Sequence, residues 1–196
     1  TSINVAIRCR QGNLNSIPHH FLLGGDRIET CDISDSTELE SIGCSAFDGT
    51  YRLSSLILPT FLNLTTIGDK FFLNGGLWSD VPPSLNFGDC PNLRHIGNYF
   101  CYRASVTDIL FGELPQLEDI GTHFCCTSCN SGCVKVVDLS GATKLTRIAD
   151  RSTFCSGNGG KMTLLLSDKS TFADNYKTAN GVVGFSSCTN VGLKWR

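Results

Sequence analysis

The chain lacks the features that mark several large classes of protein. No stretch approaches the roughly 18 consecutive apolar residues that a membrane-spanning helix requires, so we expect no transmembrane segment. The 16 lysines and arginines are balanced by 18 aspartates and glutamates, the net charge is −2, and no basic run occurs. We therefore expect no nucleic-acid partner, because such a partner is bound by a surplus of positive charge.

Signatures of catalysis are also missing. The sequence contains no phosphate-binding loop, no Gly-x-Ser-x-Gly and no His-Glu-x-x-His. Of the four histidines, His95 and His123 lie beside core residues of the repeat described below, and we interpret them as surface residues of turns. The sequence thus predicts a protein that is not an enzyme and needs no cofactor.

A repeated block organises most of the chain. In each copy a leucine is followed three residues later by an isoleucine and, four to six residues further on, by a phenylalanine. The copies are Leu14/Ile17/Phe21, Leu39/Ile42/Phe47, Leu64/Ile67/Phe71 (or Phe72), Leu93/Ile96/Phe100, Leu117/Ile120/Phe124 and Leu145/Ile148/Phe154. Their isoleucines are 25, 25, 29, 24 and 28 residues apart, and self-similarity at such a period is typical of stacked-repeat proteins.

Apolar residues ahead of each block predict a strand, because they alternate as a strand with one buried face requires. The inward residues are Cys31, Ile33, Leu56, Leu58, Leu85, Phe87, Ile109, Phe111, Val137 and Leu139. One such unit cannot bury its apolar face alone, whereas stacked copies can. We therefore predict a repeat solenoid over residues 1–196, a single domain. It would be a right-handed superhelix of about seven rungs with few helices and a parallel sheet on one face.

The uneven spacing locates two insertions and a cap. Residues 73–83 and 125–133 lengthen two of the copies, and both follow the block phenylalanine, so we place them at the same edge of the solenoid. The pattern ends near residue 167. Ser170 is suited to begin a helix, and we predict a short helix over residues 170–180 within a C-terminal cap at 167–196.

The blocks resemble a known family. They read Leu-Glu-Ser-Ile-Gly-Cys-Ser-Ala-Phe (39–47), Leu-Thr-Thr-Ile-Gly-Asp-Lys-Phe-Phe (64–72), Leu-Arg-His-Ile-Gly-Asn-Tyr-Phe-Cys (93–101) and Leu-Glu-Asp-Ile-Gly-Thr-His-Phe-Cys (117–125). This is similar to the BspA-like leucine-rich repeats, whose pattern runs Leu-x-x-Ile-Gly-x-x-Ala-Phe-x-x-Cys. The resemblance covers roughly residues 28–180. It implies a leucine-rich-repeat fold, a secreted or cell-surface location, and adhesion to host components or other cells. Pro18 and Ala149 stand where the family has glycine.

The chain has eleven cysteines, and an odd number leaves at least one without a partner inside the chain. Six of them form two groups of interest. In the first group, Cys101, Cys125 and Cys155 each follow a block phenylalanine, and we expect either a ladder of buried side chains or disulfides between neighbouring turns. The group in the second insertion is Cys125, Cys126, Cys129 and Cys133. It admits a local disulfide, a zinc site or a redox Cys-x-x-Cys pair. Because four-cysteine zinc sites ordinarily use two separated pairs, we favour the disulfide and predict no metal.

The strand residues between the buried ones predict a contact surface. They are Asp32, Ile57, Asn86, Leu110, Asp138 and Leu165. Solenoid faces commonly bind partners, and exposed Ile57 and Leu110 would suit a protein or peptide. The other reading is a solvated sheet that tolerates apolar residues. Trp78, in the first insertion, is either a binding hot spot or a side chain that folds back over the solenoid edge.

Together these observations predict a non-catalytic protein-binding or adhesion module that recognises a protein or a host or cell-surface ligand, outside the cell or on its surface. One alternative is a metal- or redox-active module built on residues 125–133. Another is a purely structural segment of a longer surface protein. The start at Thr1 rather than Met leads us to expect a processed or trimmed chain.

Overall fold

The computed structural model describes residues 5–8, 14–126, 134–148, 154–155, 162–170 and 191–195, with only the backbone described at 5, 126, 155 and 191–195. These residues form a parallel β-solenoid of about five turns and contain no helix. The repeat solenoid expected from the sequence is therefore confirmed. Apart from Ser170, the helix predicted at 170–180 lies outside the described residues.

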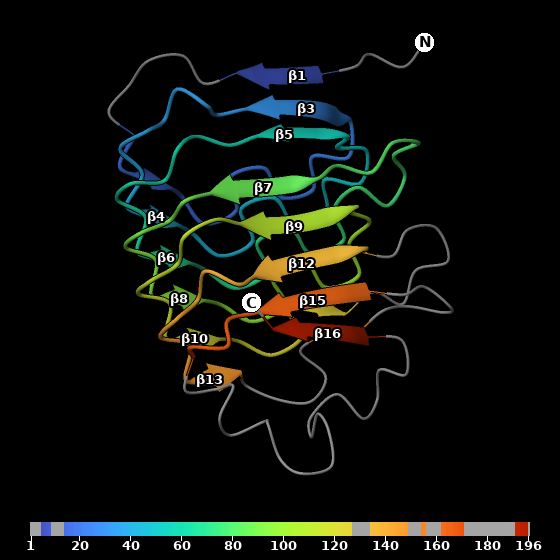
Figure 1. Cartoon of the computed structure of the whole chain (residues 1–196). Helices are drawn as coiled ribbons and strands as arrows, with labels where there is room; N and C mark the ends of the chain where they lie inside the picture. Colours follow the sequence, from blue (N-terminus) through green and yellow to red (C-terminus); the bar gives the residue numbers. More distant parts are fainter. Residues whose placement is uncertain are drawn as a thin grey trace.

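Two stacks of strands build the solenoid (Figure 1). The strand face, in front in Figure 1, consists of β1 (Val5–Arg8), β3 (Ile28–Asp32), β5 (Ser55–Ile57), β7 (Leu85–Gly88), β9 (Asp108–Phe111), β12 (Val136–Leu139), β15 (Met162–Leu166) and β16 (Val191–Trp195). The second stack, here called the short-strand sheet, consists of β2 (Ser16–Ile17), β4 (Ser41–Ile42), β6 (Thr66–Ile67), β8 (His95–Ile96), β10 (Asp119–Ile120) and β13 (Arg147–Ile148). A further pair is formed by β11 (Cys125–Cys126) and β14 (Phe154–Cys155).

The strand face is broken between β5 and β7. Strands β1, β3 and β5 form one sheet and β7, β9, β12, β15 and β16 another, whereas the short-strand sheet runs unbroken through six strands. The break coincides with the insertion at 73–83, which directly precedes β7. The backbone N–H groups of Gly76 and Trp78 donate to the carbonyls of Thr50 (3.0 Å) and Tyr51 (2.7 Å), so the insertion is bonded to the chain just ahead of β5.

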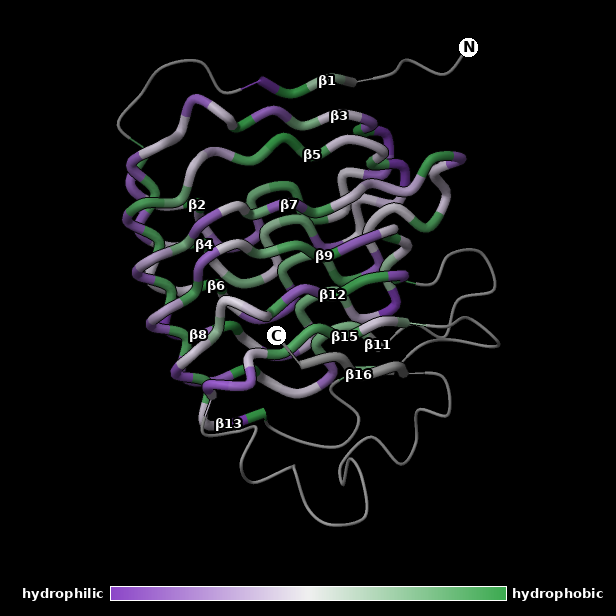
Figure 2. The backbone as a smooth tube through the Cα atoms, viewed as in Figure 1, coloured by the Kyte–Doolittle hydropathy of each residue, from purple (hydrophilic) through white to green (hydrophobic). Residues whose placement is uncertain are grey.

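The repeated leucines, isoleucines and phenylalanines fill the interior. From Leu39 to Phe154, every one of them is at most 7% exposed, and hydrophobic segments recur at corresponding places in successive turns (Figure 2). The rings follow one another through the core, with centroids 5.0 Å apart for Phe71 and Phe100 and 4.6 Å apart for Phe100 and Phe124. Phe71 rather than Phe72 continues this ladder. Each such pair adds about 0.5–1.5 kcal/mol beyond the burial of its surface.

The glycine after each isoleucine is required by close approach of neighbouring turns. A Cβ added to Gly43 would lie 2.5 Å from the backbone nitrogen of His19, and one added to Gly68 2.7 Å from that of Cys44. Real Cβ contacts are longer, so any side chain here would push the turns apart. Pro18 is accommodated at the same place in the first copy because β2 is the edge strand of its sheet.

Each turn bends through a corner that follows the glycine, and two corner positions have left-handed backbones. The first is occupied by His20, Ser45, Lys70, Tyr99 and His123, with φ between 54° and 61°. The second is occupied by Gly24, Gly49, Asn74 and Arg103. Side chains link successive corners: Oδ1 of Asp69 accepts from the N–H of Asn98 (2.7 Å), and Oδ1 of Asn98 accepts from the N–H of Thr122 (2.9 Å).

Candidate functional site

The structure brings the predicted contact residues together in two groups. Asp32 and Ile57 are partners in β3 and β5. Beyond the break, partners in successive strands run through Asn86, Leu110, Asp138 and Leu165. Ile57 is 48% exposed. Asn86 is also exposed, while Asp32, Leu110 and Asp138 are half-buried.

Leu165 does not belong to the exposed surface. The sequence places it in the outward row, but its side chain is only 6% exposed, so the prediction for this residue is wrong. Strand β16, which the sequence did not predict, pairs with β15 along its whole length and sets Lys194 beside Leu165. Leu165 is thus an interior member of the sheet rather than part of its last strand.

Asp32 and Asp138, the two aspartates among the predicted contact residues, each accept hydrogen bonds from the serine two positions further along the chain. Oδ1 of Asp32 accepts from the N–H (3.0 Å) and the hydroxyl (2.6 Å) of Ser34, and Nε of Arg8 lies 3.3 Å from Oδ2. The Ser34 hydrogen bonds, with a smaller contribution from Arg8, lower the pKa of Asp32. Ser140 binds Asp138 in the same way, at 3.0 Å and 2.6 Å. These carboxylates therefore serve the turns that follow their strands.

One of the two interpretations made for Trp78 is confirmed, because its side chain folds back over the solenoid edge. Its indole folds back and stacks on the ring of Tyr51, with centroids 4.3 Å apart and planes 22° apart, yet the residue remains 59% exposed. Val81 is 69% exposed in the same loop. The Ser79 hydroxyl donates to the Val81 carbonyl (2.7 Å), and the Val81 N–H donates back to that hydroxyl oxygen (3.2 Å). The loop thus presents two large apolar side chains in a fixed conformation.

A shallow pocket of about 210 Å³ lies beside this loop. Trp78, Ser79, Asp80 and Val81 form one side, and Glu29, Arg52 and Ser54 form the other. The Ser54 N–H and hydroxyl both donate to the Glu29 carbonyl, which fixes that wall. A partner's apolar side chain could lie against the indole with polar groups within reach on both sides.

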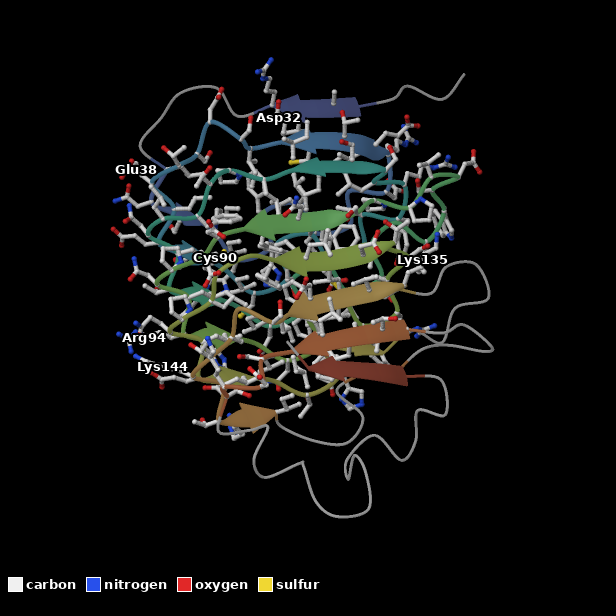
Figure 3. The ribbon with its side chains drawn as sticks, viewed as in Figure 1. Asp32, Glu38, Cys90, Arg94, Lys135 and Lys144 are labelled. Carbon is white, nitrogen blue, oxygen red and sulfur yellow. The ribbon has the colours of Figure 1, made fainter. Side chains whose placement is uncertain are left out.

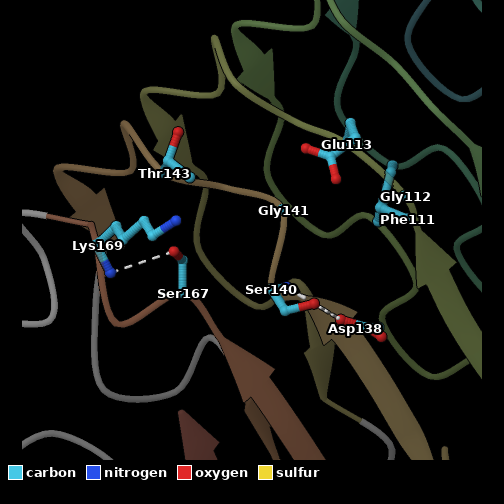
Figure 4. A pocket seen from close by; sticks show the side chains of 9 residues that line it. All are labelled: Phe111, Gly112, Glu113, Asp138, Ser140, Gly141, Thr143, Ser167 and Lys169. Carbon is cyan, nitrogen blue, oxygen red and sulfur yellow. Dashed lines mark hydrogen bonds between the residues drawn. The ribbon is translucent and has the colours of Figure 1, made fainter. Parts of the chain in front are cut away.

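A second, larger pocket of about 380 Å³ lies at the carboxyl ends of β9, β12 and β15 (Figure 4). Its lining includes the polar residues Glu113, Thr143 and Lys169 together with the ring of Phe111. Ser167 holds the backbone there by accepting from the Lys169 N–H (3.3 Å). The sequence did not predict this pocket, because its lining residues follow three different strands and form no motif in the sequence.

Cys31, Cys90, Cys101 and Cys125 are buried in the core, whereas Cys44 is half-buried. Cys101 and Cys125 are fully buried, as the buried-ladder reading expects. Burial raises the pKa of the Cys101 thiol well above its usual value, and the neighbouring Cys125 adds to this. Burial also raises the pKa of Cys90 to about 12, with a contribution from Asp89. These thiols therefore stay protonated near neutral pH.

The second cysteine group is described only in part. Cys126 is opposite Cys155 in the pairing of β11 with β14, while Cys129 and Cys133 lie outside the described residues. Within the part of the chain that the structure describes, no three His, Cys, Asp or Glu side chains are grouped as metal ligands would be.

Charged and polar side chains cover the short-strand sheet and its edge, where Glu38, Arg94 and Lys144 are labelled in Figure 3. His95 lies in strand β8, not in a turn as the sequence reading had it, and its Nδ1 is 2.5 Å from Oδ1 of Asp119. Arg147 approaches the same oxygen at 3.4 Å. Ion pairs and hydrogen bonds link neighbouring strands on this surface, and the outward residues of its strands, Ser16, Ser41, Thr66, His95, Asp119 and Arg147, are all polar.

Comparison with known proteins does not assign the chain to a group. No protein-family model matches the sequence, and a search of curated proteins gives no match either. Among the described residues there is no helix long and apolar enough to span a bilayer.

Proposed function

We propose that the chain is a non-catalytic protein-binding module, a leucine-rich-repeat solenoid of the BspA-like type, which contacts its partner through the loop 73–83 and the exposed part of the strand face. The observation that carries the proposal is the pair Trp78 and Val81. They are 59% and 69% exposed although the loop that holds them is hydrogen-bonded to the solenoid.

Pre-ordering is what makes these residues suitable anchors. Binding costs free energy when side chains and loops must be ordered, and a loop that is already fixed avoids most of that cost. Stacking on Tyr51 leaves the indole one face for a partner. Tryptophan is among the residues that most often dominate binding energy, and truncating a hot-spot residue costs about 2 kcal/mol or more.

The repeated block supports a secreted or cell-surface location and a protein partner. The Leu-x-x-Ile-Gly block occurs at successive turns, and the structure accounts for each of its residues as core or as close backbone approach. The similarity of that block to BspA-like repeats favours a secreted or cell-surface protein that adheres to host or cell-surface proteins. The polar short-strand sheet favours placing the contact on the other side of the solenoid.

The test is a binding screen against purified extracellular-matrix and cell-surface proteins by surface plasmon resonance, followed by variants. The double variant Trp78→Ala/Val81→Ser should weaken the strongest interaction at least tenfold, and Ile57→Lys should weaken it too. Leu62 is the matched control, because it is 55% exposed but lies outside the proposed surface. The proposal fails if Leu62→Ser weakens binding as much as the double variant, or if neither affects any interaction found.

A further inference from the structure

A third pocket, with a distinct character, lies between the corner that follows β6 and the corner that follows β8. Its volume is about 210 Å³. The lining residues are Lys70, Leu73 and Asn74 from the first corner and Tyr99, Tyr102 and Arg103 from the second. None of these six is acidic. Two aromatic rings and two cations therefore converge on one small hollow.

The aromatic wall is held in place by ring contacts. Tyr99 stacks on His123 of the next corner, with centroids 5.0 Å apart and planes 17° apart. Tyr102 meets both rings edge to face, 5.4 Å from each. All three rings are half-buried. The Tyr99 ring is thus fixed from one side, and with Tyr102 it offers a rigid surface to a ligand.

Four residues that line this pocket have left-handed backbones, a conformation that glycine adopts at a lower cost in free energy. Lys70, Asn74, Tyr99 and Arg103 have φ of 59°, 56°, 57° and 56°. A left-handed backbone costs a residue with a Cβ about 1–2 kcal/mol, and glycine avoids that cost. The equivalent second positions in the two preceding corners are Gly24 and Gly49. Glycine is therefore compatible with the backbone conformation where Arg103 stands.

The charge around the pocket favours an anion. One carboxylate is close by, because Asp48 accepts a hydrogen bond from the Asn74 side chain and is influenced by the charge of Lys70. Arg103 belongs to the opposite wall, and its planar guanidinium can hold a carboxylate or sulfate by two parallel hydrogen bonds. The volume admits a single ring rather than an extended ligand.

We propose that this pocket binds an acidic sugar, with the pyranose ring against Tyr99 and Tyr102 and its carboxylate or sulfate between Lys70 and Arg103. The pocket adjoins the loop 73–83 through Leu73 and Asn74, but its cations and its tyrosine rings lie outside that loop, so the proposal does not depend on the protein contact at Trp78. It would add recognition of the glycan part of a cell surface to recognition of a protein.

The test uses the whole chain and four probes in isothermal titration calorimetry: sialyllactose for the carboxylate, a sulfated heparin tetrasaccharide for the sulfate, lactose as the neutral sugar, and inorganic sulfate as the bare anion. At least one acidic sugar should bind, and lactose and inorganic sulfate should bind at least tenfold more weakly. If neither acidic sugar binds at millimolar concentration, or if inorganic sulfate binds as well as the better sugar, the proposal is wrong.

Variants at the left-handed positions separate binding from folding. Tyr99→Gly and Arg103→Gly should each weaken the acidic sugar at least tenfold, and circular dichroism should show that both variants remain folded, since glycine suits the left-handed backbone there. His20→Gly is the matched control, because His20 has φ of 61° at the same position of an earlier corner and does not line the pocket. Unchanged sugar affinity in both pocket variants would overturn the proposal, as would a tyrosine-sulfated peptide that binds more tightly than either sugar.

Discussion

His95 and Asp119 face each other across strands β8 and β10, with Nδ1 of the histidine 2.5 Å from Oδ1 of the carboxylate. The two residues are 24 positions apart in the chain but occupy the same place in successive turns. Arg147, one turn further on, lies 3.4 Å from the same oxygen. Parallel in-register stacking thus converts a sequence period into a row of interacting side chains.

The His95–Asp119 contact should be a modest stabiliser. Both side chains are partly exposed, 44% for His95 and 26% for Asp119, so solvent screens the interaction. We expect a coupling free energy of about 0.3–1 kcal/mol, decreasing with salt. A double-mutant cycle with His95→Gln and Asp119→Asn, followed by urea unfolding, measures it. A coupling energy near zero at low salt would show that this contact contributes nothing to stability.

Gly97 should not tolerate a side chain. A Cβ at this position would lie 2.5 Å from Oδ1 and 2.6 Å from the backbone nitrogen of Asp69 in the preceding turn. We expect Gly97→Ala to reduce the free energy of unfolding by about 3 kcal/mol, because neighbouring turns would have to separate. Gly24→Ala is the control, since no atom lies within 4 Å of its added Cβ. It should lose only about 1 kcal/mol, from the left-handed backbone. Equal losses in urea unfolding would contradict the close-approach explanation.

Phe100 should be the more costly of two ring truncations. It is fully buried and its centroid lies 5.0 Å from that of Phe71 and 4.6 Å from that of Phe124. Phe100→Ala should therefore cost about 3–5 kcal/mol. Phe21 belongs to the first copy, is only partly buried and pairs with Phe47 at 6.0 Å. Phe21→Ala should cost clearly less in the same chemical-denaturation experiment, and a reversed order would be inconsistent with a core that weakens at its end.

Asp48 should make the protein less stable as the pH rises. Burial raises its pKa above the ordinary 3.8, although hydrogen bonds from Asn74 and Ser45 and the charges of Lys70 and His20 oppose the shift. The folded state then holds more protons than the unfolded state above pH 3.8, so stability falls as pH increases through that range. Asp48→Asn should lack this slope when unfolding is measured between pH 3 and 7.

Asp32 supplies the opposite sign for comparison. The Ser34 hydrogen bonds lower its pKa in the folded state, so its contribution to stability is present above pH 3.8 and is lost as the pH falls through the lowered value. Asp32→Asn should remove a positive slope at acid pH, whereas Asp48→Asn should remove a negative one. If the two substitutions change the slope of the wild-type protein in the same direction, one of the two environments is described wrongly.

The core was predictable from the sequence because its residues recur with the turn. The repeated block predicts its own burial and the parallel pairing of most strands, whereas the close approach of neighbouring turns at the glycines is seen only in the structure. Strand β16 was not predicted because it shows no repeat pattern. The pocket at Lys70 and Tyr99 was missed because its residues are 29 positions apart and share only a corner of the backbone.

The most direct measurement of the proposed protein contact is hydroxyl-radical footprinting of the chain alone and in complex with the partner found in the binding screen. Trp78 and Val81, at 59% and 69% exposure, should be oxidised readily in the free protein and several-fold more slowly in the complex, while Leu62 should be unaffected. If Trp78 is oxidised equally fast in both states, the loop 73–83 is not the contact and the account of this surface is wrong.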